Sequence, residues 1–295
     1  MSGHVNLRNE LCLLGLLALL WGSSYLFAKV ALKEIPPLTL VAIRVFGAAV
    51  FLTIVMRVRN DRFPKDAKTW RMLLVQSVVN AIAAWTILAW GQQHVDAGLA
   101  SVLNSTSPIF VFIFTTLVTR HERMTVLKLA GAIIGISGVC MIVGLEALQG
   151  LGAQVAAQLA CLLGAALYGC AAIYGKRFTH ISATATAAGT MIWASIVLVP
   201  SALVFERPWL LEPSRTALFC VITLALLCTG VALLLYFRLV RTLGSLGVAS
   251  QAYLRAGVGV VLGMVVLGEQ LTPTVALGLA AAVFGVALIN WPGKT

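Results

Sequence analysis

Apolar residues along this chain gather into ten runs, and short polar segments separate them. A transmembrane helix needs about 20 mostly apolar residues, and none of the connecting segments could hold a separate domain. The pattern therefore predicts an all-α integral membrane protein with ten transmembrane helices. The predicted helices cover residues 11–30, 37–56, 72–90, 99–118, 126–145, 155–174, 183–205, 216–237, 247–267 and 273–289.

The composition excludes two other classes of protein. Hydrophobic residues make up 60% of the 295 residues and charged residues only 11%, whereas a soluble domain carries about 25% charge. A disordered chain would also be richer in charge. The six cysteines lie in apolar runs without CxxC spacing, and the four histidines lie in connecting segments. We therefore expect no metal site and no cofactor.

The 21 Lys and Arg residues are distributed unevenly across the predicted membrane. If the N-terminus is cytoplasmic, fifteen lie on the inner side, four on the outer side and two, Arg44 and Arg255, inside the spans. Loops rich in Lys and Arg stay in the cytoplasm, so we expect both termini there. Topology then explains the net charge of +11, and nucleic acid is not expected as a partner.

The two halves of the chain resemble each other at a shift of 147 positions. This shift aligns residues 21–29 with residues 168–176 and Glu122 with Glu269; the alternative is a chance match of segments rich in Gly, Ala and Leu. Because each half holds five predicted helices, the halves would cross the membrane in opposite senses, as in many secondary transporters. The two predicted repeats, which together form a single transport domain, are residues 1–147 and 148–295.

Arg44 and Arg255 are the first candidates for a binding site, because a guanidinium inside a span is costly unless it faces protein or water. All ten acidic residues fall at or near span ends, so we expect no carboxylate beside the two arginines. Such a site suits a substrate with a carboxylate or phosphate group. It also favours facilitated diffusion over a proton relay. Alternatively, the arginines are structural, and Arg44 caps backbone carbonyls of a neighbouring helix.

Other polar and aromatic side chains could complete the site. The amides could bind polar groups of the substrate, and the aromatic rings could line a pocket. The alternatives are hydrogen bonding between helices for the amides and packing or interfacial anchoring for the rings. These further candidates are Asn80, Asn104, Gln251, Tyr25, Tyr168, Tyr253, Trp85 and Trp193.

Two motifs bear on helix geometry. The polar run from Asn104 to Pro108 should weaken the fourth predicted helix and expose carbonyl groups. Gly131 and Gly135 have the GxxxG spacing that lets helices approach closely. They could serve packing within the chain or a dimer interface.

Three segments resemble a known family: WGSSYLFAK at residues 21–29, NSTSPIFVFIF at residues 104–114 followed by Glu122, and LGEQLTPTVALGLAAAVFGVALI at residues 267–289. They are similar to the bacterial EamA group of the drug/metabolite transporter superfamily. The resemblance implies ten helices in two inverted halves, cytoplasmic termini, the bacterial inner membrane and alternating access around a central cavity. Within the group, the chain is most similar to the YddG-like exporters of aromatic and other amino acids. It departs from the group in helix nine, where Arg255 stands in a segment that carries a proline in many members.

Together these features predict an exporter of amino acids, aromatic ones included, that works by facilitated diffusion. Arg255 or Arg44 would bind the substrate carboxylate. The alternatives are an exporter of another small anionic or zwitterionic metabolite, with or without proton coupling, and a channel, for which rings of like polar residues would be expected. An enzyme is not expected, because the spans hold no paired aspartates, Ser/His couple or metal set. The expected partners are the small-molecule substrate and the lipid bilayer, with the protein a monomer or homodimer.

Overall fold

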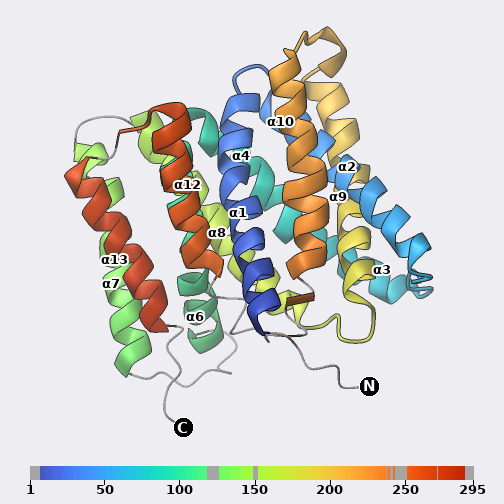
Figure 1. The fold of residues 1–295 in the computed structure, drawn as a ribbon, viewed down its shortest axis with the longest axis horizontal. Helices are drawn as coiled ribbons and strands as arrows, with labels where there is room; N and C mark the ends of the chain where they lie inside the picture. Colours follow the sequence, from blue (N-terminus) through green and yellow to red (C-terminus); the bar gives the residue numbers. More distant parts are fainter. Residues whose placement is uncertain are drawn as a thin grey trace.

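The computed structural model describes residues 7–117, 126–148, 152–236, 238–239, 242, 251–270 and 272–289. Within these ranges every regular element is helical, and the helices form a bundle (Figure 1). The helices of the first half are α1 (Leu7–Ala31), α2 (Pro37–Val58), α3 (Ala67–Ser77), α4 (Ala83–His94), α5 (Ala97–Ser105), α6 (Ser107–Leu117) and α7 (Val126–Leu148). Those of the second half are α8 (Gly152–Gly175), α9 (Ala183–Phe205), α10 (Arg215–Ala225), α12 (Gln251–Leu267) and α13 (Pro273–Ile289).

Seven helical stretches in the described ranges are long and apolar enough to cross a membrane. Three shorter apolar helices accompany them, at Val126–Met141, Leu254–Leu267 and Ala276–Gly285. The prediction of an all-α protein with several membrane-spanning helices is therefore confirmed, whereas the count of ten spans stays a prediction. The N-terminal end of α1 and the C-terminal end of α13 lie at the same end of the bundle (Figure 1). The side of the membrane that this end faces also stays a prediction.

Three of the predicted spans are not regular α-helices. A π-helical turn, Val78–Ile82, joins α3 to α4, and another, Leu226–Val231, follows α10. The fourth span breaks at Thr106 into α5 and α6, because Pro108 has no N–H with which to continue the α-helical hydrogen bonds. The polar run ending in proline thus interrupts a helix, as the sequence predicts.

In three cases, a helix of the first half packs against the helix at the matching position of the second half. The pairs are α2 with α9, α5 with α12, and α7 with α13. In Figure 1, α7 and α13 form one flank of the bundle, α2 and α9 lie toward the other flank, and α1, α8 and α12 lie between them. This pairing brings residues that are far apart in the sequence into the same layer of the bundle.

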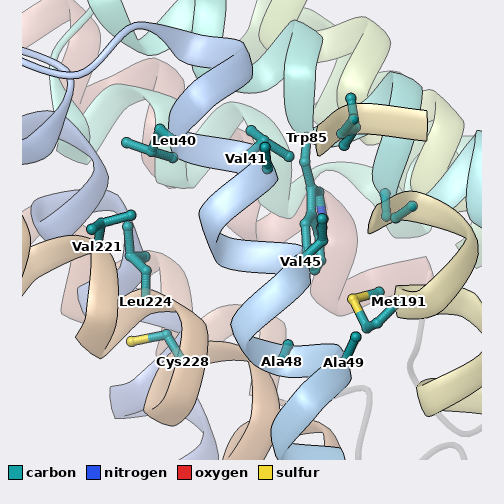
Figure 2. Packing of buried hydrophobic residues seen from close by; sticks show 14 of the residues in the cluster. Leu40, Val41, Val45, Ala48, Ala49, Trp85, Met191, Val221, Leu224 and Cys228 are labelled. Atoms are coloured by element: carbon teal, nitrogen blue, oxygen red, sulfur yellow. The ribbon is translucent and has the colours of Figure 1, made fainter. Parts of the chain in front are cut away.

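The α2 helix is the centre of a large apolar cluster. Its residues Val41, Val45 and Ala48 are at most 1% exposed. Figure 2 shows α2 between Trp85 and Met191 on one side and Val221, Leu224 and Cys228 on the other. The outer face of α2 is also apolar but is exposed, for example 55% at Phe46 and 56% at Ile54, which suits contact with lipid.

The GxxxG glycines of α7 serve packing within the chain. A Cβ atom placed on Gly285 of α13 would lie 2.5 Å from the Gly131 oxygen and 2.5 Å from the Gly135 nitrogen. Backbone atoms cannot rotate out of the way, so only glycine allows α7 and α13 to approach this closely. Of the two uses predicted for this motif, the structure shows intramolecular packing.

Carboxylates from neighbouring segments cap the starts of three helices. Glu206 accepts hydrogen bonds from two backbone N–H groups in the first turn of α2, at 3.0 and 2.6 Å, and Glu269 accepts from the first two N–H groups of α5, at 2.6 and 2.9 Å. Glu34 accepts from the backbone N–H and the hydroxyl of Ser214, at 2.6 and 2.8 Å, and these bonds lower the pKa of Glu34. The free N–H groups and dipole of a helix start favour a carboxylate there. These acids at span ends therefore have structural partners.

Candidate functional site

A polar cluster forms where α1, α5 and α12 meet; we call Tyr25, Asn104 and Arg255 the central polar cluster. The Nη2 atom of Arg255 lies 3.4 Å from both the Asn104 backbone oxygen and the Ser105 hydroxyl. The Nδ2 atom of Asn104 donates a hydrogen bond to the Tyr25 hydroxyl. The Ser101 hydroxyl donates to the Arg255 backbone oxygen at 3.3 Å. Three of the predicted site residues are thus brought together from three helices.

The local sequence explains why this contact is possible. Pro108 has no N–H to donate to the Asn104 carbonyl four residues earlier, so that oxygen faces Arg255. A Cβ atom on Gly259 would collide with the Ser101 side chain, so the glycine lets α12 lie close to α5. The proline therefore frees an acceptor, and the glycine lets the arginine helix approach it.

Three buried polar atoms of this region have no hydrogen-bond partner among the described residues. They are the donor Nε of Arg255 and the acceptors Oδ1 of Asn104 and Oε1 of Gln251. Asn104 is 1% exposed and Gln251 8% exposed. Since buried polar groups are nearly always paired, an unpaired donor beside an unpaired acceptor suits a ligand or water bound there.

Arg44 is held by Thr229 of the second π-helical turn and by Trp85 of α4. Its Nε atom donates a 2.9 Å hydrogen bond to the Thr229 hydroxyl, and its Cζ atom lies 4.0 Å from the centre of the Trp85 ring. Arg44 is deep in the bundle and yet keeps part of its surface accessible. The predicted structural alternative, in which Arg44 caps backbone carbonyls, differs from what is seen: among the described residues, Arg44 contacts a hydroxyl and an aromatic ring.

Tyr168 on α8 lies within electrostatic range of both arginines. It interacts electrostatically with Arg44, Tyr25 and Arg255, and it keeps accessible surface although it is deep in the bundle. The two arginines and the two tyrosines therefore belong to one region, in which no acidic side chain contacts an arginine among the described residues.

The other predicted site residues differ in their surroundings. Asn80 lies half-buried on the first π-helical turn. Trp193 donates from Nε1 to the Trp70 oxygen at 3.0 Å and packs edge-on against its ring, so its contacts are with α3. The Tyr253 side chain lies outside the described residues. A substrate role for these three residues stays a prediction.

Thr229 is the residue at this site that the sequence analysis missed. Thr229 is a polar residue within a long apolar run, which is a usable signal, since a hydroxyl there needs a partner. Trp85 is one of the rings that the sequence analysis proposes for a pocket, and in the structure it lies under Arg44. The π-helical turn that presents Thr229 has no recognisable local sequence pattern.

A separate groove of about 680 Å³ lies where α2 begins, beside α4 and α8. Its lining includes Leu38, Trp90 and Leu159, and the latter two are 42% and 52% exposed. The Glu206 carboxylate at its edge already caps α2. The groove is therefore an apolar surface at the side of the bundle, distinct from the central polar cluster. Among the described residues, no group of three or more His, Cys, Asp or Glu could hold a metal ion.

A bundle of membrane-length apolar helices, with deep arginines that no acidic side chain contacts among the described residues, is typical of the multi-pass membrane transporters. The chain belongs to the EamA-like transporter family, whose sequence profile matches residues 9–144 and again residues 155–291.

Similar proteins carry transporter names. The uncharacterized transporter YoaV of Bacillus subtilis (strain 168) is 27% identical over 91% of this chain and 92% of its own length. The uncharacterized inner membrane transporter YedA of Escherichia coli (strain K12) is 26% identical over 93% and 88%. A probable terminal-alkyne amino-acid exporter of Streptantibioticus cattleyicolor is 28% identical over 92% and 89%. These relatives support the family, whereas the narrower resemblance to YddG-like exporters stays a prediction.

A solved crystal structure shares the fold. It superposes with a TM-score of 0.66 at 18% sequence identity and covers 96% of this chain and 97% of its own. At this identity the likeness concerns the fold alone.

Proposed function

We propose that this protein exports amino acids and similar zwitterions across the bacterial inner membrane by alternating access. The proposal rests on two buried atoms of the central polar cluster that have no hydrogen-bond partner in the part of the chain that the structure describes, Nε of Arg255 and Oδ1 of Asn104. A zwitterion supplies what each atom lacks: its carboxylate accepts from the guanidinium, and its ammonium donates to the amide oxygen.

The aromatic side chains of the region support a range that includes aromatic amino acids. Tyr25 is hydrogen-bonded to Asn104, and Tyr168 lies within electrostatic range of both arginines. A substrate side chain placed beside these rings would exchange water for apolar contact. The similarity to a probable amino-acid exporter agrees with this substrate class, and the relative named an inner membrane transporter agrees with the proposed location.

Facilitated diffusion is the proposed mode of transport. Glu206, Glu269 and Glu34 are engaged in capping helix starts, and no carboxylate contacts Arg44 or Arg255 among the described residues. A proton relay of the usual kind needs an acid within the membrane. Flux should therefore follow the substrate gradient alone.

A second candidate is export of another small anionic metabolite. The observation that favours it is that two arginines, Arg44 and Arg255, lie in this region and that no acidic side chain contacts either of them among the described residues. A more negative substrate would neutralise both guanidinium groups. The same transport panel separates the two candidates.

The test is uptake of radiolabelled amino acids and phosphorylated metabolites into proteoliposomes, with and without an imposed pH gradient. The variant Arg255→Ala should raise the KM for amino acids roughly 10- to 100-fold, because hydrogen bonds to a charged group each contribute about 1.5–3 kcal/mol. Arg215→Ala is the matched control, since Arg215 is exposed at the start of α10. Amino-acid flux unaffected by Arg255→Ala would disprove the binding role, and flux that requires a pH gradient would disprove facilitated diffusion.

A further inference from the structure

The π-helical turn after α10 recurs at the corresponding place in the first half of the chain. Leu226–Val231 begins 148 positions after Val78–Ile82. Because π-helical turns are rare and are often found at functional sites, a pair at matching positions in both halves suggests a retained purpose. The second turn carries Thr229, which is 1% exposed and contacts Arg44.

The π-helical turn decides how the Thr229 hydroxyl is used. A threonine in a regular α-helix donates its hydroxyl to the carbonyl three or four residues earlier, as Thr53 does to Ala49 at 2.7 Å. Thr229 instead donates to the Leu224 carbonyl five residues earlier, at 2.8 Å. Its only proton is thereby committed, so the hydroxyl oxygen serves as an acceptor toward Arg44.

The guanidinium group of Arg44 is consequently held at its Nε edge and on one face of its plane. The Nε edge donates to Thr229 at 2.9 Å, and the guanidinium lies over the Trp85 ring at 4.0 Å. The two terminal Nη groups have no hydrogen-bond partner among the described residues. They are also not among the buried unpaired atoms, so they keep some accessible surface. Since Arg44 keeps accessible surface deep in the bundle, these groups can reach a ligand. A guanidinium held in this way loses little freedom when it binds an anion.

We propose that Thr229 is a positioning residue, which orients Arg44 so that its terminal Nη groups form a second anion-binding fork beside the central polar cluster. The inference rests on the proposed function and deepens it, because it assigns substrate affinity to a residue that need not touch the substrate. The Trp85 ring packs against one face of the Arg44 guanidinium, and the π-helical turn orients the Thr229 hydroxyl toward it.

The test compares Thr229→Val, which keeps the shape and removes the hydroxyl, with Thr229→Ser, which keeps the hydroxyl. Thr53→Val is the matched control, because the Thr53 hydroxyl bonds only within its own helix. For whichever metabolite of the panel the wild-type protein moves, Thr229→Val should raise the KM roughly tenfold at a nearly unchanged maximal rate. Thr229→Ser should restore the KM, and Thr53→Val should leave it unchanged. Thr229→Ala replaces the valine variant if that variant is not recovered in folded form.

Two results would overturn the inference. The first is a wild-type KM for the hydroxyl-free variants. The second is that Thr229→Val raises the KM as much in an Arg44→Gln background as it does in the wild-type protein. A positioning role acts through Arg44 and should therefore have no further effect once Arg44 is replaced. If amino acids are not moved but another anion is, the substrate assignment fails, and the Thr229 comparison still proceeds with that anion.

Discussion

Gly263 on α12 lies against the carboxylate of Glu269, and we predict that Gly263→Ala destabilises the protein only while that carboxylate is present. A Cβ atom on Gly263 would collide with Oε2 of Glu269. The carboxylate could move aside only by giving up its hydrogen bonds to the N–H groups of Ala97 and Gly98, at 2.6 and 2.9 Å. Asp96, the residue before α5, makes no side-chain cap of its own. The start of α5 therefore depends on Glu269.

The magnitude follows from the two bonds. Each hydrogen bond to a charged acceptor contributes about 1.5–3 kcal/mol, and loss of a helix cap costs about 0.5–2 kcal/mol. Because the two bonds share one carboxylate and the freed N–H groups can reach water at the end of the helix, we expect Glu269→Ala to cost about 2–4 kcal/mol. Gly263→Ala should cost about the same in the wild-type protein. In the Glu269→Ala background it should cost nothing or stabilise by up to about 1 kcal/mol, the usual gain of alanine over glycine in a helix.

The assay is thermal denaturation of the purified protein in detergent, followed with a thiol-reactive fluorophore. Cys161 and Cys228 are 0% exposed and Cys220 is 4% exposed, so unfolding should release their thiols. Either single variant should lower the Tm by on the order of 5 °C, and the double variant should be no less stable than Glu269→Ala. If the two losses simply add, the proposed collision and the cap at α5 are not coupled, and the reasoning is refuted.

Two further predictions concern packing and pH. Gly285→Val should greatly reduce the folded yield measured by size-exclusion chromatography, because its Cβ would lie 2.5 Å from the Gly131 backbone oxygen. The control Gly15→Val should have little effect, since nothing lies within 4 Å of a Cβ at that position. Equal yields of the two variants would contradict the close α7–α13 contact. The bonds from Ser214 lower the pKa of Glu34 from its ordinary value of 4.5, so the stability that Glu34 contributes should be complete above that value and be lost as the pH falls through the lowered pKa. Thermal denaturation from pH 6 downward should show a weaker pH dependence for Glu34→Gln, and identical profiles would argue against this cap.

The contacts of the central region also separate two kinds of residue. Arg255 has a buried Nε without a hydrogen-bond partner among the described residues, and we propose that a substrate supplies the missing acceptor. Arg44 is bound along its Nε edge and covered by Trp85, so only its terminal groups remain available. The sequence distinguishes the two arginines only in outline: it offers a capping role for Arg44 and places Arg255 where many family members carry a proline. Their different roles arise from the helices packed beside them.

The sequence by itself determined the class of this protein and much of its outline. Apolar runs longer than a bilayer is thick predict helices whatever their partners are, since hydropathy is a property of each segment alone. The break near Pro108 is likewise local, because a missing N–H interrupts a helix in any surroundings. The positions of Arg44 and Arg255 within spans are visible for the same reason.

Only the tertiary structure decided which residues these features meet. The GxxxG glycines fit a dimer interface or an internal contact equally well until Gly285 of α13 is seen against Gly131. The bond between Arg44 and Thr229 spans 185 positions, and that between Glu269 and α5 spans more than 170. Such pairs depend on how two distant helices pack and, at Thr229, on a π-helical turn that redirects one hydroxyl. No local pattern encodes them, because their energies exist only once the halves of the bundle have come together.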